Sequence, residues 1–142
     1  MNSRRIDELL EMFHRRATIT VTFGMRLSYT DTGQAVIDLP YNPGLNHGLG
    51  GIHGGIYMTL LDTAAWFTAA AAHDESAWVA TSELTVHLLK PARETALQAV
   101  GQMVQSGRRQ DIVEANLYDD QGLLIAHGIG TFILLPDLRL NG

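Results

Sequence analysis

The sequence contains no cysteine, only four prolines and little charge, since 18% of its 142 residues are Asp, Glu, Lys or Arg. Without cysteine the chain can form no disulfide, no thiolate metal site and no cysteine nucleophile, which is compatible with a reducing compartment. It also has no long basic run, and its net charge is −5. We therefore do not expect a protein that binds nucleic acid through the phosphate backbone.

A long uncharged hydrophobic run is also missing. Residues 1–16 lack the continuous apolar core of a signal peptide. The most apolar segment, residues 56–72, contains Asp62 and three threonines and is shorter than the roughly 20 residues of a membrane span. We expect a cytoplasmic protein with no membrane partner. Apart from His53, the histidines lack metal-ligand spacing, so the expected site holds no metal and no other cofactor.

Two helices are predicted from the apolar pattern. Apolar residues at helical spacing indicate an amphipathic helix over residues 4–15, within the N-terminal segment 1–16. A glycine-rich loop over residues 41–55 leads into a long apolar helix over residues 54–73. The apolar share of the whole chain is 46%, and a partner subunit is expected to cover part of that surface. We therefore expect an oligomer.

Six strands are predicted on the two sides of the long helix. Residues 17–31, which are rich in β-branched side chains, and residues 35–40 are expected to form a hairpin. Four further strands follow, over residues 78–90, 96–107, 110–120 and 122–136. Strands on both sides of one central helix favour an α+β fold, with an antiparallel sheet wrapped around that helix. Residues 1–142 then form a single domain.

Asp62 is the only charged residue between Gly54 and Ala72. An ionised carboxylate in an apolar setting costs free energy unless it is paired, hydrogen-bonded or protonated. Two interpretations follow. Asp62 is either a structural acid, bonded to a neighbouring hydroxyl such as that of Thr59 or to a partner subunit, or a functional acid kept in this setting for its chemistry.

The start of the long helix offers a complementary group. Free backbone N–H groups at His53, Gly54 and Gly55 can hold a carbonyl oxygen as it becomes an oxyanion. At a rise of about 1.5 Å per residue, Gly54 and Asp62 lie roughly 12 Å apart along the helix, too far to act on one carbonyl within one chain. If they cooperate, two chains share each site across a two-fold axis, with two sites per dimer.

These motifs resemble the hotdog-fold acyl-CoA thioesterases, in particular the phenylacetate-pathway (PaaI-like) branch. The residues that carry the resemblance are Asn46, the HGG motif ahead of Asp62, the strand end LLKPA and the turn GRR. The resemblance extends from about Asn42 to Leu135. It implies a hotdog fold and hydrolysis of an acyl-CoA or a related thioester. It also implies a homodimer or a dimer of dimers, with coenzyme A present only as part of the substrate.

The resemblance implies catalytic roles for individual residues. The N–H groups of Gly54 and Gly55 would polarise the thioester carbonyl. Asp62 of the partner chain would attack the carbonyl or activate a water, and Asn46 would position the carbonyl or the water. A hydroxyl on the strand after the helix, matched by Thr81, would orient Asp62 or the water.

Two of these assignments depart from the family pattern. Asn46 lies seven positions before His53, where the family has six. Unbroken alternation along the strand would place Thr81 on the face opposite Leu84 and Val86, so the Thr81 assignment requires an irregular start of the strand. His53 has two interpretations as well, since its ring either shapes the start of the helix or transfers a proton.

Substrate-binding residues are predicted on two elements. Arg108 and Arg109 either hold the phosphates of coenzyme A or form a solvated turn. Four side chains of the long helix either line an acyl pocket or belong to the core: Tyr57, Met58, Trp66 and Phe67. Trp66 lies one turn after Asp62 on the same face of the helix.

Two other functions remain open from the sequence. The same fold could act as a hydratase or dehydratase, with His53 and Asp62 meeting across the dimer. It could also bind acyl-CoA without catalysis, because a fold alone does not fix a function.

Overall fold

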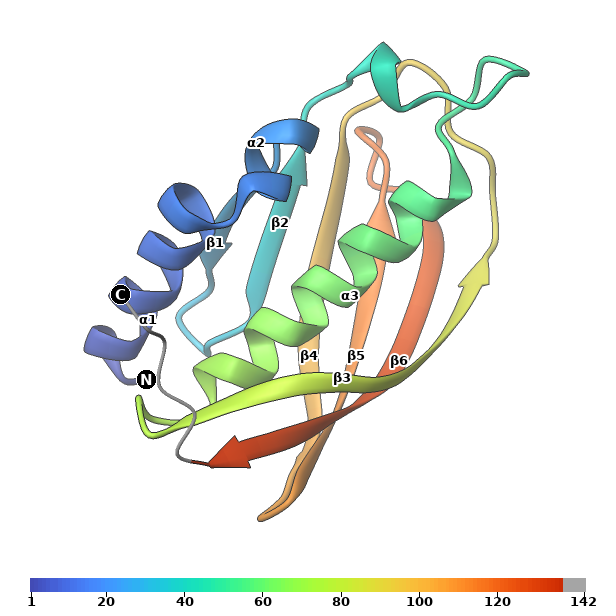
Figure 1. Ribbon diagram of the computed structural model, residues 1–142. Helices are drawn as coiled ribbons and strands as arrows, with labels where there is room; N and C mark the ends of the chain where they lie inside the picture. Colours follow the sequence, from blue (N-terminus) through green and yellow to red (C-terminus); the bar gives the residue numbers. More distant parts are fainter. Residues whose placement is uncertain (137–142) are drawn as a thin grey trace.

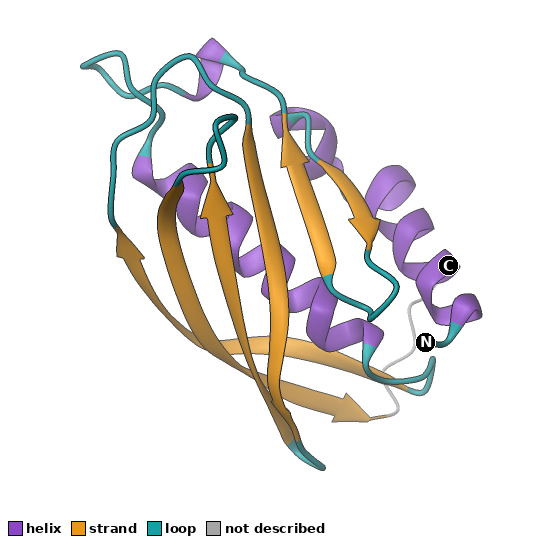
Figure 2. Ribbon diagram, turned by 180° about the vertical axis from the view of Figure 1, so that it is seen from behind, coloured by secondary structure: helices purple, strands orange, loops and turns teal. Residues whose placement is uncertain are grey.

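The computed structural model describes residues 1–136, which form a six-stranded antiparallel sheet with the long helix α3, Gly54–Ala71, across one face (Figure 1). The strand order is β1-β2-β4-β5-β6-β3. The strands are β1 Arg26–Tyr29, β2 Ala35–Leu39, β3 Ala77–Leu88, β4 Leu97–Ser106, β5 Gln110–Tyr118 and β6 Leu124–Pro136. The predicted α+β arrangement is therefore confirmed, and Figure 2 shows the opposite face of the sheet without a helix over it.

The core lies between α3 and the concave face of the sheet. Leu60, Leu61, Ala64 and Ala65 of α3 are 0% exposed, and the small alanines let the helix approach the strands closely. Gly101 of β4 makes the closest approach, because a Cβ there would lie 2.5 Å from the carbonyl oxygen of Ala64. This tight contact fixes the position of α3 over the sheet.

The N-terminal segment forms helices and packs beside β1. Helix α1, Ser3–Glu11, continues into a single π-helical turn, Met12–Arg16, and is followed by the short helix α2, Thr18–Phe23. None of the helices in the described part of the chain combines the length and the apolarity that a membrane crossing requires.

The prediction of a strand over residues 17–31 is wrong for its first half. The β-branched residues favour a strand, but Gly24 adopts φ 81 and its N–H caps a helical turn at the carbonyl of Thr20. Ile19 and Val21 are 50% and 77% exposed, so no sheet buries them as a strand pattern would require. The strand starts only at Arg26.

Arg5 anchors the C-terminal end of α3. Its side chain is 0% exposed and donates to the carbonyls of Ala70 at 3.1 Å and Ala77 at 2.8 Å. The guanidinium also lies 4.1 Å from the ring centroid of Trp78 and pairs with Glu8 at 2.8 Å. A cation at this position complements the negative end of the helix dipole. The far end of α3 is therefore firmly fixed.

Candidate active site

Asp62 lies on the side of α3 that faces β3, a strand at the edge of the sheet. It is half-buried, and its Oδ1 accepts a hydrogen bond of 2.8 Å from the hydroxyl of Thr81 on β3. Met58, one turn before it, is 42% exposed. β3 is an edge strand that pairs with β6 alone among the described strands. The acid therefore lies at an open boundary between a helix and a free sheet edge.

An irregularity in β3 turns Thr81 toward Asp62. Thr81 pairs with Phe132, whereas Glu83 pairs with Thr131, so Ser82 is an extra residue in the ladder. Such a bulge reverses the faces of the residues that precede it. The irregular strand start that the Thr81 assignment required is present, and Thr81 and Asp62 are brought together.

Burial raises the pKa of Asp62 above its ordinary value, and the hydrogen bond from Thr81 lowers it in part. A carboxylate with a single donor in a poorly solvated position holds its proton more tightly than a free carboxylate does. It is also a stronger base once it has lost that proton. This is the environment that a general base or a nucleophile needs near neutral pH.

The start of α3 presents one unengaged N–H group at the surface. His53 is the N-cap residue, and its Nδ1 accepts from the N–H of Gly55 at 2.8 Å. Because Nδ1 accepts, the neutral ring carries its proton on Nε2. The N–H of Gly55 is thus engaged by the ring of His53. Among residues 1–136, the N–H of Gly54 has no hydrogen-bond acceptor. The ring of His53 therefore shapes the helix start.

Asn46 lies beside His53 despite the longer spacing in the sequence. A bridge between Asn46 and Ile52 closes the intervening loop, and the N–H of His53 donates to the carbonyl of Leu45 at 3.1 Å. The amide of Asn46 donates to the hydroxyl of Tyr41 at 3.1 Å, while its buried Oδ1 has no partner within the described chain. The additional residue is accommodated in the loop.

A small apolar cavity adjoins Gly54. Its volume is about 250 Å³, and its walls include Ile52, Tyr57, Leu88 and Leu89. The hydroxyl of Tyr57 donates to the carbonyl of Lys90 at 3.1 Å, and burial raises the pKa of this tyrosine. Tyr57 is one of the residues predicted either to line an acyl pocket or to belong to the core, and it lines this cavity. Leu88 was not predicted as a lining residue.

Trp66 joins α3 to the edge strand. Its indole N–H donates to the carbonyl of Val79 at 2.9 Å, and its ring packs against Phe67 and Trp78. It is half-buried and lies one turn after Asp62 on the same face of the helix. Met58 lies on the other side of Asp62, and the two side chains border the acid along the helix.

Arg108 and Arg109 are exposed at the turn between β4 and β5 and line a surface hollow of about 600 Å³. The hairpin that carries them projects beyond the neighbouring strands (Figure 1). They lie apart from Gly54, near the end of the sheet where β6 finishes, since the N–H of Leu134 donates to the carbonyl of Arg109 at 2.9 Å.

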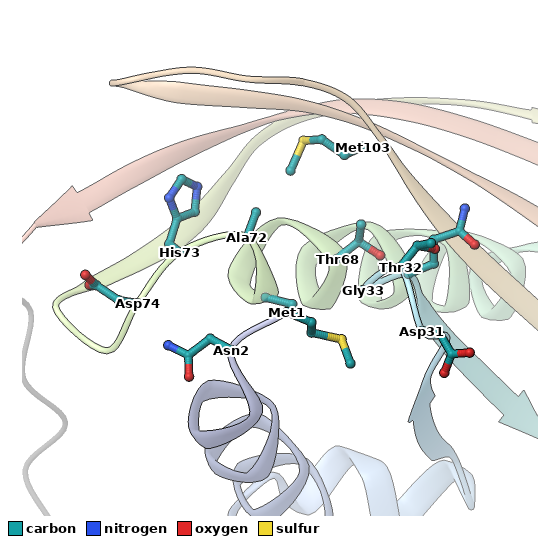
Figure 3. A pocket seen from close by; sticks show the side chains of 12 residues that line it. Met1, Asn2, Asp31, Thr32, Gly33, Thr68, Ala72, His73, Asp74 and Met103 are labelled. Atoms are coloured by element: carbon teal, nitrogen blue, oxygen red, sulfur yellow. The ribbon is translucent and has the colours of Figure 1, made fainter.

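Figure 3 shows another cavity, of about 490 Å³, at the C-terminal end of α3. Its walls include Met1, Thr32, Thr68 and His73, and neither Asp62 nor Gly54 contributes to it. Across residues 1–136, no group of three or more His, Asp or Glu side chains is placed to hold a metal ion.

The sequence reasoning missed a buried acid, Asp111, on β5. It is 0% exposed and bonds to His73, Ser106 and Gly107. The signal was present, because strict alternation places Asp111 in phase with the buried apolar residues of β5, Val113, Ala115 and Leu117.

Comparison with known proteins identifies relatives that match most of the chain. The family model described as Thioesterase superfamily matches residues 49–126, more than half of the sequence. A candidate esterase of Halobacterium salinarum is 32% identical over 124 residues, which are 80% of this chain and 82% of that protein.

Solved structures extend the likeness to the fold. A Bacillus halodurans protein crystallised with CoA is 33% identical, with a TM-score of 0.80 over 98% of this chain and 91% of that one. The PaaI protein of the E. coli phenylacetic acid degradation operon is 20% identical, with a TM-score of 0.83 over 96% and 98%. The likeness to PaaI concerns the fold, and it confirms the predicted hotdog architecture.

Proposed function

Since the chain belongs to the thioesterase superfamily, we propose that it hydrolyses acyl-CoA thioesters at a site shared by two copies of the chain. The observation that carries the proposal is Asp62, a half-buried acid with a raised pKa and one hydrogen-bond donor, at an uncovered edge. The similarity to a protein crystallised with CoA supports coenzyme A as the thiol of the substrate.

The dimer follows from the separation of the two reactive groups. Gly54 and Asp62 lie roughly 12 Å apart on one helix. To act on one carbonyl, the N–H of Gly54 and the carboxylate of Asp62 must therefore come from two different chains. The open stripe on α3, with Gly54, Met58 and Asp62, lies beside the free edge of β3. Two copies related by a two-fold axis would bring the Gly54 N–H of one chain opposite the Asp62 carboxylate of the other.

The reaction can proceed by two routes at such a site. In one, Asp62 takes a proton from water, the hydroxide adds to the thioester carbon, and the C–S bond breaks to release the thiolate, which then takes up a proton. In the other, the carboxylate adds directly, the thiolate leaves, and water cleaves the resulting anhydride. In both, the Gly54 N–H would stabilise the negative charge on the carbonyl oxygen.

The first experiment is thiol release from a panel of acyl-CoAs by the wild type and by Asp62→Asn. A loss of two or more orders of magnitude in a folded variant supports the site. After a single turnover in ¹⁸O-labelled water, label in the carboxylate of Asp62 would show the nucleophilic route, with water adding to the Asp62 carbonyl of the anhydride. No thiol release from any acyl-CoA by the wild type would contradict the proposal.

A mixing experiment tests the shared site. Gly54 is the first residue of α3, where proline is tolerated, so Gly54→Pro removes the N–H and keeps the helix. Asp62→Asn and Gly54→Pro should each be inactive alone. After subunit exchange at equal amounts, half of the dimers carry one intact site of two, so about one quarter of the wild-type activity should return. No recovery in a confirmed mixed dimer would show that each chain holds its own site.

A further inference from the structure

The conformation of the turn between β4 and β5 depends on one buried carboxylate. Asp111 is 0% exposed. Its Oδ1 accepts from the hydroxyl of Ser106 at 2.9 Å and from the N–H of Gly107 at 3.1 Å. Its Oδ2 is bonded to Nε2 of His73 at 2.6 Å. Asp111 therefore connects the first half of the turn to the residue that follows the C-terminal end of α3.

The second half of the turn is fixed as well. A Cβ on Gly107 would lie 2.5 Å from the carbonyl oxygen of Gln110, so the two sides of the turn touch and only glycine fits. The carbonyl of Arg109 accepts from the N–H of Leu134 on β6 at 2.9 Å. The backbone is thus anchored on both sides of the arginine pair, to β5, β6 and α3.

Within residues 1–136, no acidic side chain pairs with the two arginines that this turn displays. Arg108 and Arg109 are exposed, and neither forms a salt bridge within residues 1–136. Two adjacent guanidinium groups on a rigid backbone are suited to an anion with several oxygens, because each guanidinium offers two parallel N–H donors.

We infer that Asp111 is a positioning residue that holds Arg108 and Arg109 in the geometry that binds the phosphate groups of coenzyme A. The inference rests on the proposed function for its ligand. Asp111 acts through the turn: it is fully buried, and it lies in the same row as Thr81 with Phe132 between them. Two strand spacings separate it from Thr81, roughly 10 Å, so it does not touch the reacting atoms. Its removal should weaken substrate binding and leave the chemical step intact.

The experiment compares two thioesters that share an acyl group, the acyl-CoA and the acyl-pantetheine, which lacks the nucleotide and its phosphates. In Asp111→Asn, the KM for acyl-CoA should rise about tenfold, as expected for the loss of hydrogen bonds to a charged group. Its kcat should stay within about twofold, and the KM for acyl-pantetheine should not change. Ser106→Ala should give the same pattern with a smaller rise, and Ser28→Ala on β1 serves as the matched serine control.

A purely structural role would alter the kinetics of both thioesters equally, and that result, like no change with either, overturns the inference. Should Asp111→Asn fail to fold, Gly107→Ala distorts the same turn without touching a buried charge and carries the same expectation. The double substitution Arg108→Gln and Arg109→Gln should raise the KM for acyl-CoA on its own. Adding Asp111→Asn to it should then cause no further rise, and a full additional rise would show that Asp111 acts elsewhere.

Direct binding separates this inference from the proposed function. Calorimetry with CoA and with pantetheine needs no turnover. Weaker binding of CoA by Asp111→Asn, with unchanged binding of pantetheine, supports the inference even if the wild type hydrolyses no thioester. Equal CoA binding by the wild type and the variant contradicts it even if hydrolysis is rapid.

Discussion

Asp62 and Asp111 are two carboxylates on the concave side of the same sheet, and they are satisfied to very different degrees. Asp111 is fully buried and has three hydrogen-bond partners, from a histidine, a serine and a backbone N–H. Asp62 is less buried and, within residues 1–136, accepts from a single donor, Thr81.

The difference shows that burial alone does not identify a reactive acid. An acid with a full set of donors is held in one geometry and stabilises what surrounds it. An acid with one donor at an open edge keeps lone pairs for a substrate or a water, and its raised pKa favours proton uptake. The count of donors, more than the exposed area, separates the two roles.

The largest expected effect is on catalysis. Asp62→Asn keeps the shape of the side chain and removes its basicity, so kcat for acyl-CoA hydrolysis should fall by two or more orders of magnitude. Its free energy of unfolding should not decrease, because an amide costs less to bury than a carboxylate. Thiol-release kinetics and urea unfolding check both parts. If Asp62→Asn kept its activity, Asp62 would not be a reactive acid, and its role would not differ from that of Asp111.

Asp111→Ala should affect stability most. It removes a buried carboxylate that accepts hydrogen bonds from His73, Ser106 and Gly107. Because hydrogen bonds to a charged group are strong, we expect a loss of about 3–5 kcal/mol in the free energy of unfolding. Urea denaturation measures it, with Asp62→Ala as the control, for which less than about 1 kcal/mol is expected. Equal losses in the two variants would show that donor count does not distinguish the acids.

The pH dependence should follow Asp62. Its pKa in the folded protein is raised above the ordinary value of 3.8, so the folded state binds more protons than the unfolded state between these two pKa values. The contribution of Asp62 to stability is thus present below pH 3.8 and is lost as the pH rises through the folded pKa. Over the same window kcat/KM should rise. Unfolding curves of the wild type and Asp62→Asn at several pH values test this, and parallel curves would contradict it.

The smallest expected effect comes from Thr81→Val. Removing the hydroxyl takes away the interaction that lowers the pKa of Asp62, so the rising limb of the pH–rate profile should move to higher pH. Near neutral pH the rate should fall by about threefold to tenfold, as for the loss of one hydrogen bond. Thr85→Val, further along β3, is the matched control. An unchanged pH–rate profile would mean that Thr81 does not lower the pKa of Asp62.

Much of the fold could be predicted because its signals are local. The long helix and the last four strands follow from period and turn residues, and they agree with the structure to within a few residues. Residues 17–25 could not be predicted, because their β-branched composition favours a strand while Gly24 and the burial of Thr20 select a helix. Tertiary contacts override propensity in such a segment.

In the candidate site, too, some features could be predicted from the sequence and others depend on the fold. Asp62, His53 and Gly54 stand out in the sequence, since a lone charge and paired glycines are visible there. The division of labour between Gly54 and Gly55 is not visible, because it depends on the direction of the His53 ring. The network around Asp111 also escaped notice, because it joins residues 38 positions apart that meet only after the sheet has formed.

The pairing of β3 with β6 has a consequence for how the protein is made. During synthesis, the strand that carries Thr81 leaves the ribosome long before its partner strand, Leu124–Pro136. Until then β3 has no neighbour in the described sheet, so the strand that supplies the hydrogen bond to Asp62 is not yet held in place. Contacts of such long sequence separation form slowly. Asp62 and Thr81 therefore reach their final positions only after β6 has been synthesised and has paired with β3.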